Sequence, residues 1–175
     1  MTPAPSYRDI AYSGLFGAAA LLLPTVFHLI HLGHVFMPMY LPLVALAFFV
    51  RPAFAMLTGF IVPILSGAMT GMPPFYPPIA FCMAIEIAAM AGLIATARRK
   101  WPSLRPLLPL IAALVVGRVI YTTLAYGLAL ALHLPAKFVA GLSLLAGWPG
   151  IVLMLVVIPS IVRIQSQTTS KGLTQ

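Results

Sequence analysis

The sequence predicts an all-α integral membrane protein with six transmembrane helices, the second and third of them short, and with both termini in the cytoplasm. Of its 175 residues, 62% are hydrophobic and only 7% are charged, and the mean hydropathy is +1.07. A soluble domain has about a quarter of its residues charged, so this chain lacks the polar material for a water-facing exterior. Its apolar residues form long stretches with basic residues between them, which is typical of multi-pass membrane proteins.

The predicted spans follow from the limits of these stretches, because a membrane-crossing helix needs about 20 apolar residues. The stretches cover residues 11–30, 39–50, 53–68, 79–97, 107–132 and 138–164. We treat residues 1–175 as a single six-helix membrane domain, with 165–175 as a cytoplasmic tail.

The first stretch is interpreted as a membrane span rather than a cleaved signal peptide. Arg8 and Asp9 precede it, and it continues to about residue 30. The apolar core of a signal peptide is only about 7–15 residues long.

The second and third stretches are separated by Arg51 and Pro52, because proline resists helix interiors and constrains the residue before it. Residues 39–50 and 53–68 are shorter than the required length of about 20. We therefore expect a half-buried hairpin packed on the other helices, which is tolerated where protein surrounds it.

Three polar or proline-rich segments separate the remaining spans. They are "MTGMPPFYPP" at 69–78, "ARRKWPSLRP" at 97–106 and "HLPAK" at 133–137.

The orientation follows from the basic residues. With the N-terminus inside, the inner side holds Arg8, Arg51, Arg98, Arg99, Lys100, Arg105, Arg163 and Lys171. Only Lys137 then falls outside, and Arg118 lies within a span. This excess agrees with the positive-inside rule. The net charge of +8 is thus explained by topology, and we expect no nucleic-acid partner.

The predicted outer face is rich in histidine, methionine and aromatic residues. In "HLIHLGH" (28–34) the spacing puts His28 and His31 on neighbouring faces of a helix end, and Gly33 leaves His34 in a loop. Metal binding, hydrogen bonding to an organic ligand and a role as interfacial filler all remain open. Met72, Phe75 and Tyr76 belong to an outer loop.

Two charges lie deep within predicted spans. Glu86 is the only acidic residue after Asp9, and Arg118 is the only cation well inside a span. A charge at the bilayer centre costs about 2.5–3.5 kcal/mol on insertion scales, so both should face the protein interior. They form a structural pair, contact a ligand, or do both.

Cys82 precedes Glu86 by four residues, so the two side chains share a helical face. Cys82 is either a small buried filler or a soft ligand for a metal-centred cofactor. Four aromatic residues either add polar tips to an apolar pocket or act as interface anchors: Tyr40, Tyr121, Tyr126 and Trp148. Gly14 and Ala18 form a small-xxx-small pair that permits close helix approach.

Several motifs are absent. The sequence contains no G-x-x-x-x-G-K-[ST], no H-E-x-x-H and no G-x-S-x-G, and its single cysteine excludes an intramolecular disulfide. We expect neither a nucleotide-driven motor nor an enzyme.

Four segments resemble a known family, the substrate-binding S components of energy-coupling factor (ECF) vitamin transporters. They are "GHVFMPMYLPLVALAFFVRP", "PILSGAMTGMPPFYPPIAFCMAIEIAAMAGLIA", "GRVIY" and "AGWPGIVLMLVVIPSIV". The resemblance spans roughly residues 10–165.

The resemblance implies a bacterial cytoplasmic-membrane subunit that captures a vitamin from outside. It also implies a coupling transmembrane subunit that meets Gly14 and Ala18, two separate ATPase subunits, and no bound cofactor. The implied substrate-binding residues are His31, His34, Met72, Phe75, Tyr76, Cys82, Glu86, Tyr121 and Trp148.

Family members for nickel and cobalt begin with a metal-binding Met-His, whereas this chain begins "MTPAP". Cobalamin remains among the candidate substrates, since Cys82 or a histidine would be able to ligate its cobalt. The sequence identifies neither the vitamin nor the oligomeric state, nor whether the energising module is dedicated or shared. The rival interpretations are an intramembrane metalloenzyme that uses the outer histidines and Glu86, and a metal-ion permease.

Overall fold

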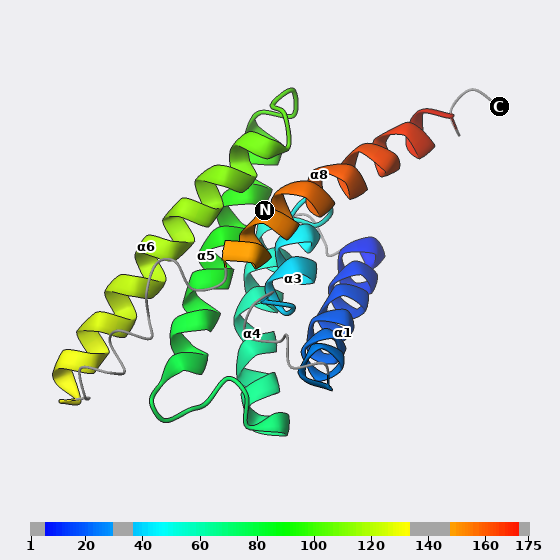
Figure 1. The fold of residues 1–175 in the computed structure, drawn as a ribbon. Helices are drawn as coiled ribbons and strands as arrows, with labels where there is room; N and C mark the ends of the chain where they lie inside the picture. The colour runs from blue at the N-terminus through cyan, green and yellow to red at the C-terminus, as the bar shows by residue number, and fades with distance from the viewer. Residues whose placement is uncertain (1–5, 30–36, 134–147, 172–175) are drawn as a thin grey trace.

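The structure is a computed structural model that describes residues 6–29, 37–133 and 148–171. Within these ranges the chain is helical and contains no strand, which confirms the predicted all-α class (Figure 1). The helices are α1 (Tyr7–Leu29), α3 (Tyr40–Leu46), α4 (Pro52–Thr70), α5 (Ile79–Lys100), α6 (Leu107–Ala131) and α8 (Trp148–Lys171).

Four segments are long and apolar enough to cross a membrane: Tyr7–Phe27, Pro52–Thr70, Ile79–Lys100 and Leu107–Ala131. A shorter apolar helix covers Trp148–Ile164. This composition is compatible with a multi-pass membrane protein. The count of six spans and the side on which each terminus lies stay predictions, and residues 138–147 of the sixth predicted span fall outside the described ranges.

The expected hairpin of two short segments is wrong for α4, which has 19 residues and is long enough to span. Pro52 does not delay the helix, because it occupies the first turn, where a missing N–H is tolerated. At the other end the helix continues to Thr70. Gly71 then adopts a left-handed φ of 74° and donates its N–H to the Gly67 carbonyl, which is a common way to end a helix.

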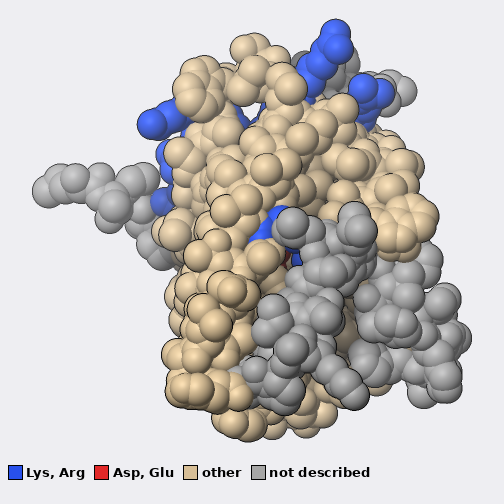
Figure 2. Space-filling model, turned by 60° about the vertical axis from the view of Figure 1, so that its left-hand side comes forward, with Lys and Arg blue, Asp and Glu red and all other residues tan. Residues whose placement is uncertain are grey.

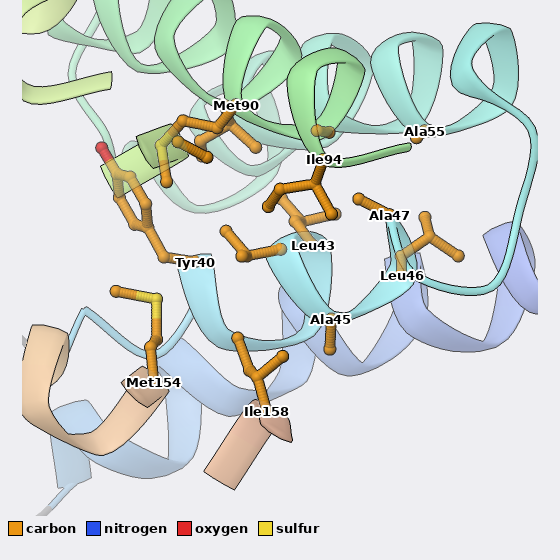
Figure 3. Close-up of a cluster of buried hydrophobic side chains, with 14 of the residues drawn as sticks. Tyr40, Leu43, Ala45, Leu46, Ala47, Ala55, Met90, Ile94, Met154 and Ile158 are labelled. Atoms are coloured by element: carbon orange, nitrogen blue, oxygen red, sulfur yellow. The ribbon is translucent and has the colours of Figure 1, made fainter. Parts of the chain in front are cut away.

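The second predicted segment is indeed short, and α3 forms the centre of the core. At seven residues it is about 10 Å long, so it does not cross a bilayer. It packs against α1, α4, α5 and α8. Figure 3 shows Met90 and Ile94 of α5 on one side of α3 and Met154 and Ile158 of α8 on the other.

Small residues allow α4, α5 and α6 to lie close together. A Cβ atom at Gly59 of α4 would lie 3.1 Å from a methyl carbon of Ile87. A Cβ atom at Gly117 of α6 would lie 2.4 Å from the Met90 sulfur and 3.3 Å from Cγ of Glu86. The backbone of α6 therefore approaches α5 beside Glu86.

An ion pair joins the start of α1 to the turn before α4. Arg51 donates to the Asp9 carboxylate from its backbone N–H at 3.1 Å and from Nε at 2.6 Å. Asp9 is buried. The guanidinium also lies over the Phe54 ring, 5.4 Å from its centroid.

The two ends of the helix bundle differ in charge. At one end, Arg51, Arg98 and Arg99 line one hollow and Arg105 and Arg163 line another. Figure 2 shows most of the basic side chains gathered toward the upper edge. We call this the basic end. The opposite end, which we call the loop end, carries the connection between α4 and α5 and the last residue of α6 (Figure 1).

Candidate functional site

Glu86 is buried inside the bundle and accepts a hydrogen bond from the Tyr40 hydroxyl. The carboxylate lies about two turns into α5, the helix that also carries Met90 and Ile94 toward α3. Tyr40 is the first residue of α3, and it is buried as well. The short buried helix therefore brings a donor to the carboxylate from 46 residues away in the sequence.

Arg118 lies near the middle of α6 and donates from Nη2 to the sulfur of Met37 at 2.9 Å. Its charge interacts electrostatically with Glu86. Met37 has φ of 48°, which is unusual for a residue with a side chain and is a form of strain found at functional sites.

The expected pairing of Glu86 with Arg118 takes a looser form than a direct ion pair. Within the described ranges the chain's one ion pair joins Arg51 to Asp9, whereas Glu86 bonds Tyr40 and Arg118 bonds Met37. A thioether is a weak acceptor, and a guanidinium has five N–H donors. The hydrogen bonds within the described ranges thus leave donors on Arg118 and acceptor sites on Glu86 unused.

Two other predicted site residues lie at the same place. Tyr121 is one turn beyond Arg118 on α6 and interacts electrostatically with Glu86 and Cys82. Cys82 is buried. We call Met37, Tyr40, Glu86, Arg118 and Tyr121 the interior polar cluster, with Cys82 beside it.

The outer-loop residues lie at the loop end. Exposed fractions are 58% for Met72, 40% for Phe75 and 74% for Tyr76. The loop is fastened to α4, because Ser66 Oγ donates to the Met72 carbonyl at 2.7 Å and Thr70 Oγ1 donates to the same carbonyl at 3.1 Å. The Phe75 and Phe81 rings lie 5.7 Å apart. The structure holds this loop and the interior polar cluster as separate groups.

Of the remaining predicted substrate-binding residues, the structure describes Trp148 alone. Trp148 begins α8 and is 62% exposed. His31 and His34 lie outside the described residues. No group of three or more His, Cys, Asp and Glu side chains converges within residues 6–27, 37–133 and 148–164, the part of the chain whose side chains the structure describes.

Gly14 and Ala18 lie on an exposed face of α1, and no described residue outside the local helix backbone comes within 4 Å of where a Gly14 Cβ would be. Only 11% of the membrane-length part of α1 is buried, compared with 50% for α5. This face is therefore open to a partner helix or to lipid.

Met37 and Tyr40 are the cluster members that the sequence-based list of site residues lacked. The signal for Tyr40 is a lone hydroxyl in the apolar run "MYLPLVALA", where a buried phenol needs a partner. Met37 carries no comparable signal, because a methionine in an apolar chain is ordinarily a gap filler.

No protein-family model, no curated protein and no solved structure matches this chain.

Proposed function

We propose that this chain is the substrate-binding subunit of a vitamin-type uptake system, as its resemblance to ECF S components implies. The observation that carries the proposal is the interior polar cluster, in which hydrogen-bonding capacity remains on both a buried carboxylate and a mid-helix guanidinium. Ionisable groups within membrane segments are expensive and usually serve a substrate path.

The cluster indicates the chemistry of the substrate. Arg118 offers donors to an anionic or carbonyl-bearing group, whereas Glu86 offers an acceptor to a hydroxyl, amine or amide. Tyr121 adds an aromatic face beside them. A small organic molecule with both kinds of polar group fits this combination, as many water-soluble vitamins do. The apolar walls from α3 and α5 exclude water and strengthen each polar contact.

The open face of α1 supports the proposed coupling partner. Gly14 and Ala18 lie on it, and small residues let another helix approach closely in a membrane. The partner is a coupling transmembrane subunit that transmits the work of two ATPase subunits, and the substrate enters from the outer face of a bacterial cytoplasmic membrane.

Native mass spectrometry on the protein purified from cells grown in rich medium tests substrate capture. We expect a stoichiometric organic ligand, because a tight binder retains its substrate. The variant Arg118→Gln should lose this ligand, and Ser160→Ala should keep it, since that hydroxyl bonds only its own helix at the Val156 carbonyl. Equal ligand content in both variants, or no ligand from any medium, would contradict the proposal.

Transport assays test the partner. Gly14→Leu should abolish ATP-driven uptake in cells that supply the coupling and ATPase subunits, while ligand retention stays intact. Val26→Phe is the control, because it adds bulk to an exposed position more than two turns beyond Ala18. Loss of ligand in Gly14→Leu would place Gly14 in the pocket instead.

Thiol labelling tests the orientation. On a Cys82→Ala background, Tyr76→Cys at the loop end should react with a membrane-impermeant reagent in whole cells. Trp101→Cys at the basic end should react only after lysis, since both side chains are well exposed in the structure. The reverse labelling pattern would show that the protein has the opposite orientation in the membrane.

Metal analysis separates this proposal from the rival of an intramembrane metalloenzyme. Stoichiometric zinc or iron in the purified protein, lost in a His31→Ala/His34→Ala variant, would favour the rival. A metal content that is substoichiometric and unaffected by that variant agrees with the proposal.

A further inference from the structure

A groove of about 670 Å³ lies between the beginning of α6 and the middle of α8. Its lining consists of Arg105, Pro106, Leu107, Leu155, Val156, Pro159, Ser160 and Arg163. It belongs to the basic end and is separate from the interior polar cluster. A volume of this size lies within the range of about 300–1,000 Å³ that is typical of ligand pockets.

The groove is positively charged. Its lining among the described residues includes two arginines and no Asp or Glu side chain, because the two acidic residues of the chain, Asp9 and Glu86, lie elsewhere and bond Arg51 and Tyr40. Two guanidinium groups across a groove suit the oxygens of a phosphate, which they recognise through paired N–H donors.

The walls between the arginines are apolar and face outward. Leu107 is 42% exposed and Val156 is 63% exposed. Leu107 belongs to a segment long and apolar enough to cross a membrane, Leu107–Ala131, and Val156 belongs to the shorter apolar helix Trp148–Ile164. A ligand of this groove therefore meets two cations and exposed apolar side chains together.

We propose that the groove binds an anionic phospholipid, with the phosphate between Arg105 and Arg163 and the acyl chains along Leu107 and Val156. Basic pockets between transmembrane helices are known sites for anionic lipid headgroups. The proposal is independent of the substrate-binding role, since it uses none of the cluster residues.

The other hollows of the basic end suit such a lipid less well. The hollow lined by Arg51, Arg98 and Arg99 also contains Asp9, which offsets part of its charge. The hollow beside Met56 and Trp101 contains a single cation, Lys100. Only the groove between α6 and α8 combines two arginines and apolar walls without a carboxylate among the described hollows.

The test uses the full chain in phosphatidylcholine nanodiscs with and without phosphatidylglycerol, followed by native mass spectrometry of retained lipid. Arg105→Gln/Arg163→Gln should reduce phosphatidylglycerol retention about 25-fold, from about 5-fold for each arginine near the lipid headgroup. The matched control Arg99→Gln/Lys100→Gln removes the same charge from exposed positions of α5 at the same end and should change retention less than about threefold. Equal losses in the two variants would reduce the effect to general surface attraction and overturn the site.

A second pair of variants tests the apolar wall. Val156→Ser should weaken phosphatidylglycerol retention severalfold, whereas Val115→Ser, at a similarly exposed position of α6 outside the groove, should not. Glycerol 3-phosphate should displace the lipid only weakly, because it lacks acyl chains. Efficient displacement by glycerol 3-phosphate, or no effect of Val156→Ser, would overturn the assignment to a lipid.

Discussion

The two carboxylates of this chain are buried in contrasting ways. Asp9 accepts two hydrogen bonds from one residue, Arg51, and forms a direct ion pair at the basic end. Glu86 accepts a bond from the neutral hydroxyl of Tyr40, while the nearest opposite charge, Arg118, donates to a methionine sulfur.

The difference separates a structural contact from a candidate binding site. A buried charge requires a partner, and one that is fully paired has little capacity left for anything else. Arg51 provides that pairing for Asp9, and the result fastens α1 to the turn before α4. Glu86 and Arg118 interact electrostatically without forming a direct ion pair. A polar ligand is therefore able to occupy the hydrogen-bonding positions that remain on both side chains.

The largest expected effect on stability comes from Asp9→Asn. Breaking a buried ion pair costs about 3–5 kcal/mol, and because Arg51 is partly exposed we expect about 2 kcal/mol. Thermal unfolding in detergent should show a lower midpoint, with ligand retention at the cluster unchanged. Arg8→Gln, which alters an exposed neighbour, is the control and should leave the midpoint nearly unchanged. A midpoint for Asp9→Asn equal to that of Arg8→Gln would mean that the ion pair does not fasten α1.

Glu86→Gln should act on binding rather than on the fold. A glutamine carbonyl still accepts the Tyr40 hydroxyl, so unfolding should change little. A hydrogen bond to a charged group is worth about 1.5–3 kcal/mol, which predicts a loss of about 10- to 100-fold in ligand affinity. Isothermal titration with the ligand that co-purifies measures this loss, and Asp9→Asn provides the comparison. If both variants lose stability and neither loses affinity, the two carboxylates have the same structural role.

Gly117→Ala should disturb the interior polar cluster by adding bulk where α6 packs against α5. The added methyl would meet the Met90 sulfur at 2.4 Å and Glu86 Cγ at 3.3 Å, and overpacking of this kind costs about 1–3 kcal/mol. Gly127→Ala on the same helix is the matched control, because no described residue outside the local helix backbone comes within 4 Å of its added methyl, and alanine is the better helix former. Denaturant unfolding should show a loss for the first variant and a small gain for the second. Equal behaviour would show that α6 is free to move away from α5.

The smallest effect concerns the coupling between Glu86 and Arg118. A double-mutant cycle with Glu86→Gln and Arg118→Ala should give a coupling of about 0.5–1 kcal/mol in unfolding, less than for the direct Asp9–Arg51 pair. The double variant should recover part of the stability lost in Arg118→Ala, since no unpaired carboxylate remains. If the losses of unfolding free energy in the two single variants simply add, Arg118 and Glu86 do not interact, and Arg118 contacts only Met37 and the ligand.

The sequence by itself determined the all-helical, apolar character of the protein and the burial of Glu86. The apolar stretches predicted three of the four long membrane-type helices, α1, α5 and α6, to within a few residues at each end, because crossing a lipid bilayer demands a length and an apolarity that are legible in the sequence. The i, i+4 spacing of Cys82 and Glu86 likewise placed them on one face, since that relation is local to a helix. The sequence-based prediction made α4 too short. The ends of this helix depend on a proline tolerated in the first turn, Pro52, and on the left-handed conformation of Gly71 after Thr70, and hydropathy reports neither.

Only the tertiary structure decided how the charges are partnered. Tyr40 and Glu86 are 46 residues apart, Asp9 and Arg51 are 42 apart, and Met37 and Arg118 are 81 apart. Each of these contacts depends on how the seven-residue α3 and its flanking turns pack between the long helices. Hydropathy and periodicity describe one helix at a time. Which polar atom meets which is set by the docking of separate helices, where buried donors and acceptors must find partners within the space that packing leaves.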